Sequence, residues 1–468
     1  MDAGFLARIQ FALTIGFHYI FPPFSIGLGL ILVFMEGAYL KTKNPIYEKA
    51  ARFWVKIFAL IFAIGVATGI VMEFQFGTNW SNYSRYVGDV FGSALAAEGI
   101  FAFFLESGFL AVLVFGWDKV SAKVHFFSTI MVAFGATFSA IWIVVANSWM
   151  QTPAGFHIVG EGLNSRAEIT SFWEMVLNPS SIDRLSHVIS AAWLTGAFLV
   201  LSVSAYYILK RRHIEFARES MKIALLVAVV ASLLQLFTGH QSAVGVAENQ
   251  PTKLAAMEAH YDSLAPASLS LFGWVDEESK EIKFSVALPG MLSYLIYGDT
   301  ETPVQGLNAF NPEDLPPVNI VFQTYHIMVA IGFTLILISL LGLFYIYRGT
   351  LVEKKWLLWI FVFAVLGPQL ANQLGWATAE VGRQPWIVYG LMRTSEAASV
   401  VVNSGQIIFS IILFTLIYLL LFVLFIYLLN EKIKLGPDIT DEIRSEYQRQ
   451  KRILERPNFL KRKNNSGE

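Results

Sequence analysis

Long apolar stretches, separated by short polar connections, dominate the 468-residue chain. Nine stretches reach or nearly reach the roughly 20 apolar residues that a helix needs to cross a bilayer. They lie at residues 9–35, 53–76, 94–116, 124–150, 185–209, 222–239, 318–347, 356–379 and 406–429. The sixth is short, and Pro22-Pro23 in the first predicts a kink, because proline lacks the helical N–H. The pattern predicts an all-α integral membrane protein, a bundle of about nine transmembrane helices.

One connection, residues 240–317, is much longer than the others. Loops beyond about 15 residues are usually functional or disordered. This loop combines the acidic residues Asp276, Glu277, Glu278 and Glu281 with an apolar patch at 288–296, so we expect it to be partly folded. We expect a single transmembrane domain over residues 1–430 that contains the loop. A basic tail follows at 431–468, with a predicted helix near 441–454.

The basic residues predict the orientation of the bundle, because Lys and Arg concentrate in short cytoplasmic loops. With the N-terminus outside, 25 of the 34 Lys and Arg residues fall on the inner side, including the ten of the tail. The opposite orientation would invert this rule. We therefore expect the N-terminus and the 240–317 loop outside and the C-terminus in the cytoplasm.

Composition supports the membrane prediction and excludes several classes of protein. Hydrophobic residues make up 55% of the chain and charged residues only 15%, against about 25% charged in soluble domains. The net charge of -1 gives no basic footprint for nucleic acid. Cysteine is absent, which excludes disulfides, iron–sulfur clusters and thioether-attached haem. The first apolar stretch has no cleavage site after it, so we interpret it as a retained helix rather than a signal peptide.

Ionisable residues inside membrane spans are costly and are therefore candidates for function. The candidates in these stretches are His18, Lys56, Glu98, Glu106, His187, His326 and Glu380. Lys56 lies near an inner boundary, where its long side chain can reach the interface, so we set it aside.

Four potential ligands share one depth under the predicted topology, since His18, His187, Met328 and Glu380 all fall in the outer half of the bilayer. Each has a simple alternative: a hydrogen-bonded core histidine, a packing methionine, or a carboxylate paired with Arg383. Together they make haem plausible. His/Met ligation gives a low-spin electron-transfer haem, whereas a single His or Glu leaves a position open for dioxygen.

Glu98 and Glu106 share the third stretch. In an α-helix they would be separated by about 12 Å of rise and roughly 80° of rotation, so they can line one cavity at two depths. The alternative is a pair of protonated carboxyls that bond to neighbouring helices. Two such residues in one span favour a proton relay.

Several segments around these residues resemble subunit I of the cytochrome bd family of quinol oxidases. They are RIQFALTIGFH at 8–18, EFQFGTNWSNYSRYVGDVFG at 73–92, ALAAEGIFAFFLES, FGWDK, VANSWMQTPAG, TKLAAMEA at 252–259 and GWATAEVGRQPW at 375–386. The resemblance extends over essentially the whole chain. The loop lacks the long insertion of some members, which indicates the short quinol-loop type.

The resemblance implies a set of haem ligands. His187 and Met328 would be the axial pair of a low-spin haem b. His18 and Glu380 would be the proximal ligands of two high-spin haems, a haem b and a haem d (or a third haem b in its place). Which of these two residues holds which haem stays open.

The resemblance also implies roles for residues beside the haems. Trp376 would lie between haems, Arg383 would neutralise propionates or support Glu380, and Glu98 and Glu106 would be the neighbouring carboxylates. Lys253 and Glu258 would bind the quinol head in the loop. Better-known members carry an arginine two residues before the methionine ligand, whereas this chain has His326, so the propionate contact credited to that arginine is in doubt here.

By this resemblance we expect a quinol:dioxygen oxidoreductase in a bacterial or archaeal cytoplasmic membrane. It would oxidise menaquinol or ubiquinol outside, reduce dioxygen to water with cytoplasmic protons, and so generate proton motive force. A second membrane subunit (subunit II) is implied, with a small single-span subunit as a further candidate and no nucleic acid. Two alternatives are an ion-coupled transporter that uses Glu98 and Glu106, and a di-haem electron relay that leaves Glu380 unexplained.

Overall fold

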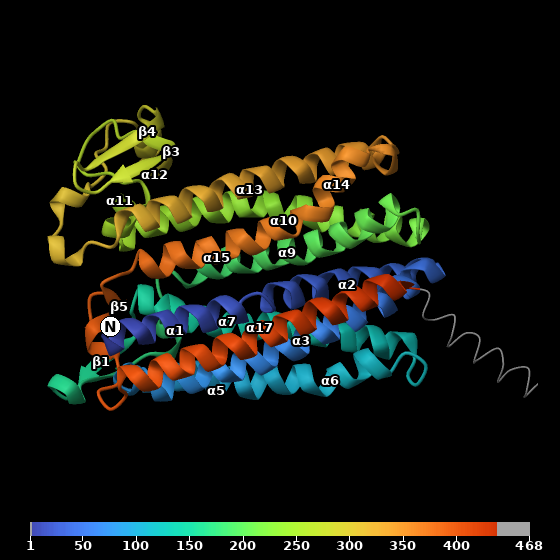
Figure 1. Cartoon of the computed structure of the whole chain (residues 1–468), viewed down its shortest axis with the longest axis horizontal. Helices are drawn as coiled ribbons and strands as arrows, with labels where there is room; N and C mark the ends of the chain where they lie inside the picture. The colour runs from blue at the N-terminus through green and yellow to red at the C-terminus, as the bar shows by residue number, and fades with distance from the viewer. Residues whose placement is uncertain (1, 438–468) are drawn as a thin grey trace, which may run out of the picture.

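The computed structural model describes residues 2–437, and within them nine helical segments are long and apolar enough to cross a membrane. The prediction of about nine spans is therefore confirmed. The helices run side by side along the long axis of the molecule (Figure 1). They are α1 (Ala3–His18) with α2 (Pro22–Thr42), α3 (Pro45–Thr78), α5 (Gly88–Ala97) with α6 (Phe104–Phe115), α7 (Ala122–Gln151), α9 (Ser181–Leu209), α10 (Ile214–Asn249), α13 (Val318–Tyr347), α14 (Lys355–Ala364) with α15 (Leu366–Val381), and α17 (Ser404–Leu435).

The first span is broken rather than merely kinked. Helix α1 ends at His18 and α2 begins at Pro22, because the two prolines cannot donate to the preceding turn. Two glutamines of α15 take up freed backbone carbonyls: Gln369 Nε2 donates to Ile20 O at 3.0 Å, and Gln373 Nε2 donates to Gly16 O at 2.8 Å. The break leaves His18 as the last residue of α1, with its side chain against Thr68 of α3.

The third span departs from a regular α-helix at the first of its two glutamates. A π-helical turn, Glu98–Phe103, joins α5 to α6. Such turns occur frequently at functional sites. The rotation of roughly 80° expected between Glu98 and Glu106 assumed α geometry, and the π turn makes that assumption wrong.

The sixth span is longer than its apolar stretch. Helix α10 has 36 residues and continues to Asn249, into the segment expected to be loop. Its last turns contain polar residues such as His240 and Glu248, which a hydropathy window excludes although they continue the same helix.

The long loop is partly folded, as predicted. It contains α11 (Pro251–Met257), an antiparallel hairpin of β3 (Leu269–Asp276) and β4 (Glu281–Leu288), and α12 (Met291–Tyr297). Two 3-10 turns, Leu307–Ala309 and Pro312–Asp314, lead back to α13. Figure 1 shows the hairpin and α12 as a lobe at the end of the bundle where the N-terminus lies.

The remaining short elements connect the spans. They are α4 (Ser81–Tyr86), the strand pair β1 (Phe156–Val159) and β2 (Arg166–Ile169), a 3-10 turn at Gly162–Asn164, α8 (Phe172–Val176), a 3-10 turn at Leu351–Glu353, the strand pair β5 (Trp386–Val388) and β6 (Met392–Arg393), and α16 (Thr394–Ala397).

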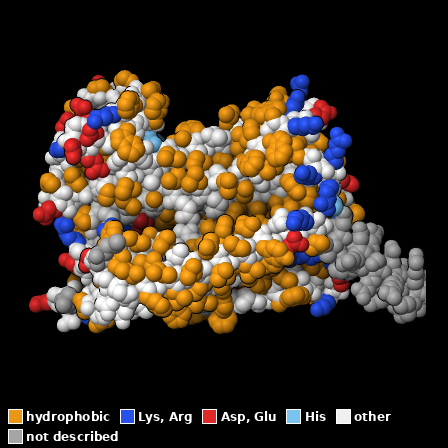
Figure 2. Space-filling model, in the orientation of Figure 1, with side chains coloured by type: hydrophobic (Ala, Val, Ile, Leu, Met, Phe, Trp, Pro, Cys, Tyr) orange, Lys and Arg blue, Asp and Glu red, His pale blue; other side chains and the backbone are white. Residues whose placement is uncertain are grey.

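Charge divides the two ends of the molecule. Figure 2 shows Lys and Arg gathered at one end, most of the Asp and Glu at the other, and hydrophobic side chains over the belt between them. The N-terminus lies at the acidic end (Figure 1). The predicted orientation depends on this unequal distribution of charge between the two ends. Which end faces the cytoplasm stays a prediction. Helix α17 continues to Leu435, past the expected boundary at 430, and the helix expected near 441–454 lies outside the described residues.

Candidate functional site

His18 is held by a threonine of the neighbouring helix. Its Nδ1 lies 3.0 Å from Thr68 Oγ1, and Thr68 is buried on α3. The ring also lies within hydrogen-bonding reach of the Gly65 carbonyl, and within residues 2–437 no side chain bonds to His18 Nε2. That nitrogen is therefore available to a ligand.

His187, near the start of α9, has the same kind of partner. Its Nδ1 lies 3.1 Å from Thr238 Oγ1 on α10, and its backbone carbonyl accepts from Gln235 Nε2 at 2.7 Å. As with His18, no hydrogen bond of His187 Nε2 is found among the described residues. Both histidines can therefore offer an Nε2 lone pair to iron.

Met328 lies in α13 and its side chain is directed at α15. A Cβ atom added at Gly375 would come within 3.0 Å of Met328 Sδ. Because Gly375 has no side chain, the Met328 thioether can occupy this space.

Glu380, at the end of α15, is surrounded by donors. Its Oε1 accepts from Asn147 Nδ2 at 3.1 Å and from Gln151 Nε2 at 3.2 Å, and its Oε2 forms an ion pair with Arg383. A further cation, Arg184, donates to Asn147 Oδ1. Hydrogen bonds and an ion pair favour the charged carboxylate.

Lys253 joins the same cluster. Its Nζ donates to Gln151 Oε1 at 2.5 Å, and the residue is only 3% exposed. Burial, together with the positive charges of Arg184 and Arg383, holds the pKa of Lys253 well below its ordinary value. Three basic side chains thus lie around the Glu380 carboxylate: Arg383 contacts it directly, and Arg184 and Lys253 reach it through Asn147 and Gln151.

The two arginines retain unused donors. Arg383 is 4% exposed, and its Nε and Nη1 are buried without a partner in the described part of the chain, as is Nε of Arg184. Buried donors without acceptors are costly, and among the described residues these two arginines have only the Glu380 carboxylate near them as an anion. The cluster therefore fits carboxylates that the chain does not supply, and the propionates of a haem have this chemistry.

Glu258 follows α11 and is separate from this cluster. It is 4% exposed, and its Oε2 has no partner in the part of the chain that the structure describes. Burial raises its pKa to about 8. Lys253 and Glu258 are both buried, but no hydrogen bond or ion pair between the two appears within residues 2–437.

Glu98 and Glu106 both face α7. Glu98 Oε1 accepts from Ser139 Oγ at 2.5 Å. Glu106 is buried against Gly135, where a Cβ would come within 2.5 Å of its Cγ. Gly135 and Ser139 are one helical turn apart, so the two carboxyls lie along the same side of α7.

Trp376 lies near two of the candidate ligands in the chain and packs against Tyr19. Its ring contacts Tyr19 edge-on, with the centroids 5.3 Å apart. Tyr19 follows His18 directly, and Trp376 precedes Glu380 by one turn of α15.

His326 connects α13 to the loop hairpin. Its Nδ1 lies 2.9 Å from Phe322 O, and its Nε2 lies 2.7 Å from Ser270 O on β3. Both ring nitrogens thus face backbone carbonyls, and a neutral ring can donate to only one of them.

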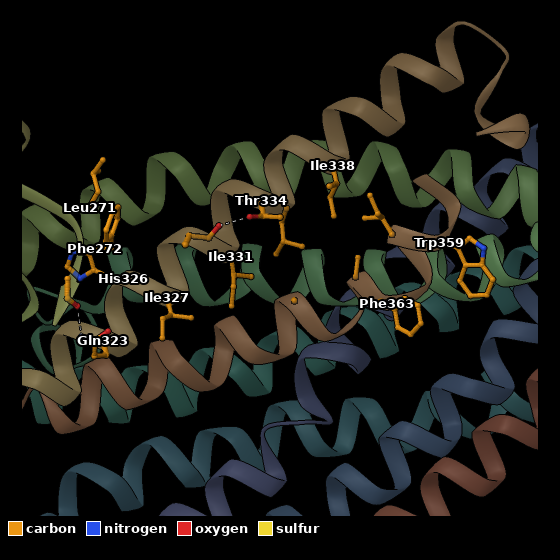
Figure 3. Close-up of a pocket in the computed structure, with 16 residues that line it drawn as sticks. Leu271, Phe272, Gln323, His326, Ile327, Ile331, Thr334, Ile338, Trp359 and Phe363 are labelled. Carbon is orange, nitrogen blue, oxygen red and sulfur yellow. Dashed lines mark hydrogen bonds between the residues drawn. The ribbon is translucent and has the colours of Figure 1, made fainter. Parts of the chain in front are cut away.

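A groove of about 760 Å³ begins beside His326 and runs along α13. Figure 3 shows Phe272 and Gln323 at one end of it and Trp359 and Phe363 at the other. Its lining is mostly apolar, so it suits hydrocarbon rather than a quinol head group. Lys253 and Glu258 are not among its lining residues.

Some ionisable residues inside the helical spans were not among the predicted candidates. Arg184 precedes His187 by one helical turn, so it lies on the same helix face as a candidate ligand, and this spacing could have marked it as a candidate. Glu36 and His125 form a buried pair, with Oε2 and Nδ1 3.0 Å apart, and Thr129 Oγ1 donates to Glu36 Oε1 at 2.7 Å. These partners satisfy each other and tie α2 to α7.

Among residues 2–437, no three His, Asp or Glu side chains are grouped so that they could hold a bare metal ion. The candidate ligands are distributed over α1, α9, α13 and α15. This distribution suits haem iron, which takes only one or two ligands from the protein.

Comparison with known proteins gives a consistent result. The family model of cytochrome bd terminal oxidase subunit I matches residues 6–437. Cytochrome bd ubiquinol oxidase subunit 1 of Bacillus subtilis (strain 168) is 42% identical over 443 residues, covering 92% of this chain and 94% of that protein. Cytochrome bd-II ubiquinol oxidase subunit 1 of Escherichia coli (strain K12) is 35% identical over 498 residues, covering 92% and 96%. The solved structure of bd oxidase from Geobacillus thermodenitrificans has a TM-score of 0.87 at 30% identity, covering 93% of this chain and 99% of that chain.

Proposed function

This chain belongs to the cytochrome bd terminal oxidase subunit I family, and from that membership we propose how its residues carry out quinol oxidation and dioxygen reduction. It is a multi-pass membrane protein and a quinol:oxygen oxidoreductase of the respiratory chain, with haem cofactors and a partner subunit. We assign it to a bacterial or archaeal cytoplasmic membrane, with subunit II as the partner and a small single-span subunit as a further one.

The haem assignment rests on one observation above all. Arg184, Arg383 and Lys253 lie around the single carboxylate of Glu380, and three arginine nitrogens in this cluster are buried without partners. Anionic propionates would supply the missing charge and acceptors. Arg184 and Arg383 are therefore the residues that would orient propionates.

The four candidate ligands fall into two groups, one that would bind a haem iron from two sides and one that would bind it from a single side. His187 and Met328 would hold a low-spin haem b on both faces. His18 and Glu380 would each hold one face of a high-spin haem, the pair being a haem b and a haem d (or a third haem b). When bound, the haems carry electrons and activate dioxygen. Asn147, Gln151 and Arg383 keep Glu380 ionised and oriented.

Quinol oxidation is assigned to α11 and the residue after it. A quinol releases two protons as it gives up two electrons, so its site needs a base. Glu258 is a buried carboxyl with an unpartnered oxygen and a pKa raised to about 8 by burial, which suits a proton acceptor near neutral pH. Lys253 can orient the head group with an Nζ–H that Gln151 does not use. Under the predicted orientation, quinol protons leave on the outer side.

Glu106 and Glu98 are assigned to the path of substrate protons. Both face α7, and Glu106 is the deeper of the two when counted from the acidic end of the bundle. Protons from the cytoplasm would reach Glu106 first and then Glu98, from which they serve the haem that reduces dioxygen. Taking protons from one side and releasing quinol protons on the other generates proton motive force.

The decisive experiment is optical. The purified protein, reduced minus oxidised, should show low-spin and high-spin haem bands, and carbon monoxide should bind only the high-spin population. An ion-coupled transporter would show no haem bands. A di-haem relay would show bands but bind no carbon monoxide, since six-coordinate haems offer no site. Either outcome refutes the proposal.

A further inference from the structure

The two candidate histidine ligands are held by the same pair of neighbouring residues. His18 lies against Thr68-Gly69 on α3, with Nδ1 3.0 Å from the threonine Oγ1. His187 lies against Thr238-Gly239 on α10, where the corresponding distance is 3.1 Å. In both places the glycine after the threonine faces the Cε1 edge of the ring. Two separate pairs of helices thus arrive at the same arrangement.

The threonine hydroxyls decide which ring nitrogen carries hydrogen. A hydroxyl has one hydrogen to donate. Thr68 Oγ1 donates to Ile64 O at 2.9 Å, and Thr238 Oγ1 donates to Leu234 O at 3.0 Å. Only oxygen lone pairs then remain for the histidines. Each ring must donate from Nδ1–H, and the lone pair of each neutral imidazole lies on Nε2.

The glycines differ in how tightly they fit. A Cβ at Gly69 would lie 3.2 Å from His18 Cε1, inside ordinary contact distance, whereas a Cβ at Gly239 would lie 3.5 Å from His187 Cε1. A side chain at Gly69 would therefore displace the ring, and an alanine at Gly239 would just touch it.

We propose that Thr68 and Thr238 are positioning residues that hold His18 and His187 as Nδ1–H tautomers with Nε2 directed at haem iron. This inference rests on the proposed function, because it takes both histidines as ligands. A hydrogen bond from Nδ1–H fixes the ring orientation and increases the basicity of the ligating nitrogen. A more basic ligand favours ferric iron and so lowers the reduction potential of that haem.

The test uses valine, which has the shape of threonine but no hydroxyl, and serine, which restores it. Thr238→Val should raise the reduction potential of the low-spin haem and speed its loss in detergent by about 10-fold or more. Thr68→Val should do the same to one high-spin haem and leave the low-spin haem unchanged. Serine at either position should return potential and retention toward parental values. Thr415→Val is the matched control, since Thr415 Oγ1 donates to Ile411 O at 2.7 Å and none of its recorded hydrogen bonds involves a histidine.

The outcomes separate this inference from the ligand assignment. His187→Ala should abolish the low-spin signal, and if it does not, the proposed function is wrong at that residue. If His187→Ala abolishes the signal but Thr238→Val leaves potential and haem retention parental, the threonine inference is wrong and the ligand assignment stands. A serine variant as impaired as the valine variant would also overturn it, since packing alone would then explain the effect.

Discussion

Gly375 offers a sharp test of the Met328 assignment, because it perturbs the ligand without replacing it. In Gly375→Ala, the new Cβ would lie 3.0 Å from Met328 Sδ. Nonbonded heavy atoms prefer separations of about 3.5–4.0 Å. The sulfur must therefore retreat by about 0.5–1 Å, which exceeds the tolerance of about 0.5 Å for a working ligand geometry. We expect a weakened or lost Fe–S bond in the low-spin haem.

Gly239→Ala is a matched control on the other face of the same haem. Its Cβ would lie 3.5 Å from His187 Cε1, an ordinary contact that requires no movement. Both changes replace a helical glycine and should stabilise the helix by about 1 kcal/mol. General effects on helix stability are therefore similar, and a difference between the two variants reports the contact with the ligand.

The assay is the reduced-minus-oxidised spectrum of each purified variant, with and without carbon monoxide. Gly375→Ala should lose low-spin intensity and gain carbon monoxide binding at that haem, as the sixth position opens. Gly239→Ala should match the parent in both measurements. A parental spectrum for Gly375→Ala, or equal disturbance by both variants, would contradict the assignment of Met328.

The other predictions concern electron entry and protons. Met328→Leu keeps the volume but removes the sulfur, so the low-spin signal and quinol oxidation should be lost while artificial donors still feed the high-spin haems; an unchanged low-spin spectrum refutes this. Quinol oxidation should rise with pH through about 8, because Glu258 accepts protons only when ionised. Glu258→Gln should lose that rise and Lys253→Ala should slow the reaction, both with nearly normal haem spectra, and parental rates in both would place the quinol elsewhere. Glu106→Gln should keep its haems but slow turnover at high pH, where protons are scarce, and Glu98→Gln should also alter the spectra. Proton uptake by vesicles at the parental rate in Glu106→Gln would exclude a relay through α6.

The sequence alone determined the architecture of the spans, because lipid leaves a chain few options. Backbone groups in hydrocarbon must be bonded within the segment, so each long apolar stretch has to be a helix. The same argument made His18, Glu98 and Glu380 conspicuous, since an ionisable group in a span is rare and costly. Pro22-Pro23 also predicted a kink after His18, where the structure has a full break, because prolines act through local geometry.

The hydropathy pattern did not predict where the sixth helix ends or how the third one is wound. Helix α10 continues to Asn249 because its final polar turns pack against the loop helices α11 and α12. The π turn at Glu98 leaves no local mark in the pattern, because it changes the winding and not the composition.

Only the tertiary structure decided how the site residues are surrounded. Asn147 and Glu380 are 233 positions apart in the chain, His18 and Thr68 are 50 apart, and His187 and Thr238 are 51 apart. Which threonine faces which histidine follows from how two helices are rotated and displaced against each other, and helix packing allows several such arrangements. The sequence supplies the chemical groups at each position. The packing of α1 on α3 and of α9 on α10 supplies their partners, because a hydrogen bond requires donor and acceptor within about 3 Å, a distance that only the assembled bundle sets.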